Sequence, residues 1–107
     1  MVDEHLHELA RQMIYLNTKK FSLIAPVAES IIECDIKDEK EIEHSLDELY
    51  DVMLIHELPE ALDLYRRLCS HYFSINPEAT FEYVQRYRNE FDPDGEKFSK
   101  FPPDEDE

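Results

Sequence analysis

Five histidines among 26 acidic residues are the side chains of this 107-residue chain that could bind a metal ion. Glu4 and His7 have the Glu-x-x-His spacing of di-iron helical bundles, and Glu41 and His44 repeat it. That chemistry also requires a bridging carboxylate from each of two further helices. His44 lies two positions after Ile42, about 200° around a helix, so we expect its side chain to point to solvent. A metal-binding helical bundle therefore remains an alternative, and we assign no metal ligand.

The other motifs that carry chemistry are incomplete. Gly95 is the only glycine, so no glycine-rich loop can cradle a phosphate. Residues 92–96 begin like an EF-hand calcium loop, but the glycine comes two positions early and Pro103 takes the place of the closing glutamate. Neither Cys34 nor Cys69 lies in a nucleophile motif, and both are expected to be buried, reduced thiols. We expect no catalytic residue, no cofactor and no enzymatic activity.

Acidic residues follow one another along a predicted helix in the middle of the chain. Glu43, Asp47 and Asp51 are spaced by four positions, with Glu48 beside them. Like charges at this spacing repel, so a helix selected only for stability would carry lysine at some of these positions. The pattern is typical either of a solvated face or of a surface that meets a basic partner.

Aromatic and arginine side chains concentrate between residues 65 and 91. Tyr, Phe and Arg are enriched in protein-recognition surfaces, but large rings also fill helical cores. We expect Phe81, Phe91, Tyr65 and Phe73 to lie in the core. Tyr83 is off that side of its helix, and with Arg86 it is the best surface candidate. The candidate interaction residues are Tyr83, Arg86, Arg66 and Arg67, and the candidate acidic face is Glu43, Asp47, Asp51 and Glu48.

The net charge of −15 limits the classes of partner. Residues 38–63 carry a net charge of −9 and residues 90–107 a net charge of −6. Direct nucleic-acid binding and binding to anionic membranes are disfavoured, because no basic patch can release counterions. No apolar run has the roughly 18 residues of a membrane helix, and the N-terminus is acidic where a signal peptide is basic. We expect a cytoplasmic protein.

Helical spacing of apolar residues runs through the whole chain. It predicts five helices, over residues 4–16, 23–34, 39–56, 59–73 and 76–91. Asp38 and Asn76 are N-cap candidates, while Pro26, Pro59 and Pro77 each suit a first helical turn. A short strand over Phe21–Ile24 is the competing interpretation. The first helix is expected to bury a stripe formed by Leu6, Leu9, Ala10, Met13 and Leu16.

The sequence thus predicts an all-α protein: a compact bundle of about five helices with antiparallel helical hairpins. Residues 1–92 form the helical domain, and residues 93–107 form an acidic, disordered tail. The leading functional hypothesis is a non-enzymatic interaction or regulatory domain with a protein partner, and a homodimer is possible. The alternative is an acidic mimic of nucleic acid that occupies the basic groove of a DNA- or RNA-binding protein.

Overall fold

The computed structural model describes residues 2–56 and 58–93, and within them side chains from residue 6 onward. This part of the chain contains four helices and no strand. The helices are α1 (Val2–Glu33), α2 (Glu39–Ile55), α3 (Pro59–Phe73) and α4 (Pro77–Phe91). The all-α prediction is confirmed and the count of five helices is wrong. The predicted acidic tail lies outside the described residues except for Pro93, so the domain boundary stays a prediction.

The first two predicted helices are one continuous helix, α1, which also excludes the alternative strand at Phe21. Pro26 lies inside α1 and does not start a helix. The helix continues through residues 17–22 because that segment packs on α2: the Asn17 side-chain amide donates to the Val52 carbonyl at 2.9 Å, and Phe21 packs against the core. Tertiary packing therefore overrides a local signal for a break.

The boundaries of α2, α3 and α4 follow from local capping. Asp38 accepts hydrogen bonds from the backbone N–H groups of Lys40 and Glu41, at 3.0 and 3.4 Å. Asn76 accepts one from the N–H of Ala79 at 3.1 Å. Pro59 and Pro77 are the first residues of α3 and α4, where the missing N–H has no carbonyl to bind. These predicted helix starts are confirmed.

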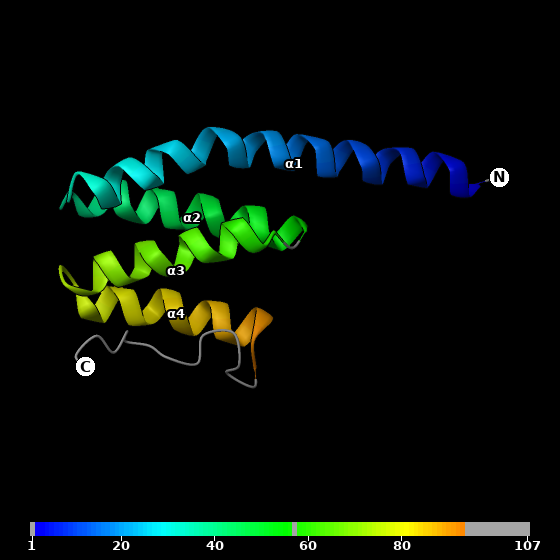
Figure 1. Cartoon of the computed structure of the whole chain (residues 1–107). Helices are drawn as coiled ribbons and strands as arrows, with labels where there is room; N and C mark the ends of the chain where they lie inside the picture. Colours follow the sequence, from blue (N-terminus) through cyan, green and yellow to red (C-terminus); the bar gives the residue numbers. More distant parts are fainter. Residues whose placement is uncertain (1, 57, 94–107) are drawn as a thin grey trace.

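Consecutive helices run antiparallel and pack side by side, with α3 also against α1 (Figure 1). The two largest side chains with no exposed surface, Tyr65 and Tyr72, come from α3. The Tyr65 ring lies 6.3 Å from that of Tyr50 and 5.9 Å from that of Tyr87, measured between centroids. The core is thus centred on α3. Its fully covered aliphatic residues are Ala28, Ile42, Leu46, Leu49, Val52, Ala61 and Leu68.

The N-terminal part of α1 extends past the end of the bundle (Figure 1). At 1.5 Å per residue, the 32 residues of α1 span about 48 Å, whereas the 17 residues of α2 span about 26 Å. Since Asn17 lies opposite Val52 and α2 ends at Ile55, few residues of α2 remain to cover α1 upstream of Asn17. The predicted burial of Leu6, Leu9, Ala10, Met13 and Leu16 is wrong: all five are exposed.

An ion pair links α1 to α3 and gives a first testable prediction. The two terminal guanidinium nitrogens of Arg67, Nη2 and Nη1, donate to the Glu29 carboxylate at 2.7 and 3.1 Å. These hydrogen bonds lower the pKa of Glu29 below its ordinary value. A carboxyl with a lowered pKa in the folded state stabilises the fold above its unfolded-state pKa, and that contribution is lost as the pH falls through the folded-state value.

We therefore expect the Arg67→Gln substitution to raise the pKa of Glu29 back toward its ordinary value, as read from the side-chain carboxyl chemical shift in an NMR titration. Arg66→Gln, which removes the same charge one position earlier on α3, is the matched control and is expected to leave the Glu29 titration as in wild type. A Glu29 titration that is the same in wild type and Arg67→Gln would show that this pair does not form in solution.

Candidate interaction surface

The predicted surface pair Tyr83 and Arg86 lies together, but Tyr83 is not on the surface. Only 8% of Tyr83 is exposed, and burial together with nearby Asp47 raises the pKa of its hydroxyl. The Arg86 guanidinium lies over the Tyr83 ring at 5.0 Å and over the Tyr50 ring at 5.3 Å. The prediction of an exposed Tyr83 is wrong, because Arg86 covers its ring and holds it against α2.

Phe81 takes the exposed position that was expected for Tyr83. It is 46% exposed and meets Phe73 edge-on, with 5.9 Å between ring centroids. The buried residues of α4 are Thr80, Tyr83, Val84 and Tyr87. The helix is therefore rotated relative to the predicted stripe, and the expectation of Phe81 in the core is wrong.

Arg66 and Arg67 are not part of the contact that Arg86 makes with the rings of Tyr83 and Tyr50. Arg67 is engaged by Glu29 of α1 and lies 3.6 Å from Asp63. Arg66 is exposed on α3, one position earlier. The four candidate interaction residues are thus divided between an α2–α4 contact and the outer side of α3, and they do not form one patch.

Three of the four candidate acidic residues have partners within the chain. Glu43 accepts a hydrogen bond from the hydroxyl of buried Tyr72. The Asp47 carboxylate lies 3.5 Å from the Arg86 guanidinium, and the Glu48 carboxylate lies 3.3 Å from the Lys20 ammonium. Asp51, the fourth, is exposed and lines a groove beside α1. These residues therefore connect α2 to three other helices and do not form one uninterrupted acidic stripe.

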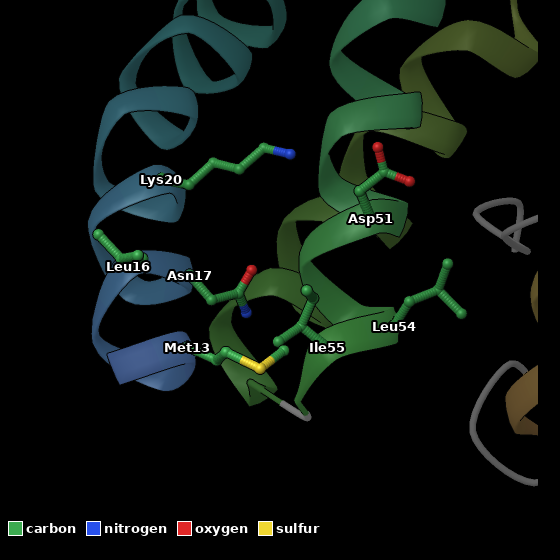
Figure 2. A pocket seen from close by; sticks show the side chains of 7 residues that line it. All are labelled: Met13, Leu16, Asn17, Lys20, Asp51, Leu54 and Ile55. Atoms are coloured by element: carbon green, nitrogen blue, oxygen red, sulfur yellow. The ribbon is translucent and has the colours of Figure 1, made fainter. Parts of the chain in front are cut away.

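The groove beside α1 is the surface feature that the sequence did not reveal. It encloses about 480 Å³ between α1 and the C-terminal turns of α2. Figure 2 shows Met13 and Ile55 at one end and Lys20 and Asp51 at the other, while Leu16 and Leu54 lie at the two rims. Buried Asn17 forms part of its lining, where its bond to Val52 holds the two helices together.

This groove is continuous with the uncovered end of α1. Leu6 and Leu9 precede Met13 and Leu16 by seven positions each, so they lie on the same side of the helix. We call these four residues, together with Leu54 and Ile55, the α1 face. Its six residues are between 45% and 63% exposed. An exposed apolar surface of this extent marks an interaction site in soluble proteins.

The described residues offer no constellation for metal or thiol chemistry. No three His, Cys, Asp or Glu side chains among them converge on a point that could hold a metal ion. Cys34 and Cys69 are free thiols; Cys34 is exposed, contrary to the prediction, and burial raises the pKa of the Cys69 thiol. None of the described helices combines the length and the apolar character needed to cross a membrane.

Comparison with known proteins gives this chain no relative. No family model, no curated protein and no solved structure matches it. The support for a function therefore comes from the arrangement of its own residues, in which the α1 face contains six of the eleven exposed large hydrophobic residues of the described part.

The sequence contained the residues of the α1 face but not their exposure. The spacing of Leu6, Leu9, Met13 and Leu16 predicts a buried stripe if the first helix ends near residue 16 and is therefore about as short as its neighbours. A useful signal was the balance of charges: residues 2–20 carry no net charge in a chain of −15.

Proposed function

We propose that this protein is a non-enzymatic interaction domain that binds a protein partner through the α1 face. The observation that carries the proposal is the position of Leu6, Leu9, Met13 and Leu16 on a helix that continues past the bundle it belongs to. Their exposure costs solvation free energy, on the order of 25 cal/mol per Å² of apolar surface, which the fold does not recover. A partner that covers the face recovers it.

The positions of the other candidate interaction residues support the α1 face as the binding surface. Arg86 and Tyr83 are held in an intramolecular stack with Tyr50, so their role in the proposed interaction is less direct than the sequence suggested. The acidic-mimic alternative requires carboxylates that are available to a basic groove. Asp47 and Glu48 already have cationic partners within the chain, which weakens that alternative.

The test is association of the full chain with and without a charge in the α1 face. We expect Leu9→Glu to lower the affinity for the partner by roughly 100-fold, because a carboxylate must be desolvated at the centre of an apolar contact. Affinity-tagged wild type and variant are compared by capture from a lysate of the native source and by light scattering after size exclusion. Glutamate is a good helix former, so α1 itself is expected to persist.

Leu23→Glu is the matched control for this substitution. Leu23 is the same residue type on the same side of the same helix and is 76% exposed, but it lies fourteen positions, about 21 Å, along α1 from Leu9 and beyond the last α1 residue of the face, Leu16. Association that is equally affected by both substitutions, or by neither, contradicts the proposal.

A further inference from the structure

We infer that the partner of the α1 face is a second copy of this chain, bound through an antiparallel contact of the two α1 helices about a two-fold axis near residue 11. The inference rests on the proposed function, since it names the occupant of the same face. Three observations carry it: the shape of the face, its charges and its area.

The shape of the face is complementary to itself. One end of it is a ridge, because Leu6 and Leu9 lie on a part of α1 that extends past the other described helices (Figure 1). The other end is a groove, between Met13 and Leu16 of α1 and the last turns of α2. A two-fold axis near residue 11 places residue 6 of one copy opposite residue 16 of the other, and residue 9 opposite residue 13. Each ridge then fills the other copy's groove, as an isologous interface requires.

The charges along α1 favour the same arrangement. Acidic residues come before the middle of the segment 2–20, at positions 3, 4 and 8, whereas Lys19 and Lys20 come after it and Arg11 is at the proposed axis. An antiparallel pair places the acidic turns of one copy beside the basic turns of the other. A parallel pair brings like charges together and leaves both grooves empty.

Lack of net charge also makes this segment suitable for a contact between two copies. Two molecules of net charge −15 repel, and the repulsion is least where the local charge is zero. Segment 2–20 meets this condition, whereas residues 38–63 and 90–107 carry net charges of −9 and −6. A contact through the acidic residues of α2 is disfavoured for this reason.

The area of the face is sufficient for a reversible dimer. With about half of each residue exposed, its six residues present on the order of 600 Å² per copy, against about 800 Å² per partner in a standard stable interface. We expect a dissociation constant in the micromolar range, roughly 1–50 µM.

The first measurement is the oligomeric state of the full chain by sedimentation equilibrium over a range of concentrations that spans that constant. Wild type is expected to change from monomer to dimer. Leu9→Glu is expected to raise the dissociation constant roughly 100-fold or more, because the substitution enters the contact twice. Leu23→Glu is expected to dimerise like wild type, within about threefold, because it adds the same charge outside the contact. Circular dichroism verifies that each variant keeps its helices.

The second measurement fixes the orientation by disulfide formation in a Cys34→Ser background, in which buried Cys69 is retained. Gln12→Cys lies next to its own symmetry mate in the antiparallel dimer and is expected to cross-link. Lys19→Cys is one heptad later on the same side of α1, so it lies opposite residue 3 of the other copy and is expected not to cross-link. In a parallel dimer positions 12 and 19 both lie on the opposite side of the contact from their symmetry mates, so neither is expected to cross-link.

The outcomes separate this inference from the proposed function. Monomers at every concentration, or a dimer in which Gln12→Cys does not cross-link, overturn the antiparallel contact. If a monomeric chain still captures a different protein in a way that Leu9→Glu abolishes and Leu23→Glu does not, the proposed function stands with another partner. If the α1 face instead mediates Leu9-dependent binding to vesicles of zwitterionic lipid and no protein is bound, both proposals fail.

Discussion

Replacing Tyr65 with alanine is expected to lower the free energy of unfolding by about 3–5 kcal/mol, a large effect for a single side chain. Tyr65 has no exposed surface, and its ring contacts the rings of Tyr50 and Tyr87. Its loss opens a cavity among helices α2, α3 and α4. Because small domains have a total stability of about 5–15 kcal/mol, the variant is expected to lose a large share of that stability and to unfold at a lower urea concentration.

The Tyr65→Phe substitution separates the ring from the hydroxyl group. The hydroxyl donates a hydrogen bond to the backbone carbonyl of Tyr83 at 3.0 Å, within the buried contact between α3 and α4. Its removal is expected to cost about 1 kcal/mol. Urea unfolding followed by far-ultraviolet circular dichroism measures both variants. If Tyr65→Phe and Tyr65→Ala lower the free energy of unfolding equally, the ring contributes nothing to packing. That result would contradict a core centred on α3.

Replacing Pro26 with alanine is expected to raise the free energy of unfolding by about 1–3 kcal/mol. Pro26 is inside α1, where it cannot donate to the carbonyl of Ser22 and its ring is crowded against that turn. The residue is exposed, so its ring contributes little packing that alanine would lose. Proline also restricts the unfolded chain, and losing that restriction lowers the free energy of unfolding by about 1 kcal/mol or less. The stabilisation from a regular turn of helix is expected to be larger than this loss.

Pro59→Ala is the matched control for this substitution. Pro59 is also exposed, but it is the first residue of α3, where no hydrogen bond is missing. Its replacement is expected to lower the free energy of unfolding by about 0.5 kcal/mol or less. The same urea titration measures both. If Pro26→Ala destabilises the protein, the proline at this position is required for the packing of α1 on α2 and α3.

The proposed role of the α1 face explains why a chain of this size contains one helix about twice as long as the others. The bundle of α2, α3 and α4 needs only the C-terminal half of α1 to cover it, as the buried residues Ala28 and Ile31 show. The N-terminal half contributes few contacts to the fold. In the dimer it becomes the contact between copies, so the helix has a structural half and a binding half that Asn17 separates.

Local sequence signals determined the helical class and the boundaries of three helices. Asp38, Asn76 and the prolines at positions 59 and 77 act over three or four residues, through capping bonds and the missing N–H of proline, so their effect does not depend on the rest of the fold. This is why they could be identified without tertiary structure.

Tertiary structure alone decided which apolar residues are covered. The same 3.6-residue spacing describes a buried stripe and an exposed one, and the difference depends on how far the neighbouring helix extends and how each helix is rotated. The end of α2 at Ile55 left Leu6 and Leu9 uncovered, and the rotation of α4 buried Tyr83 while exposing Phe81. Packing of Phe21 and Asn17 on the bundle likewise carried α1 through the segment that looked like a break, since those contacts outweigh a weak local preference.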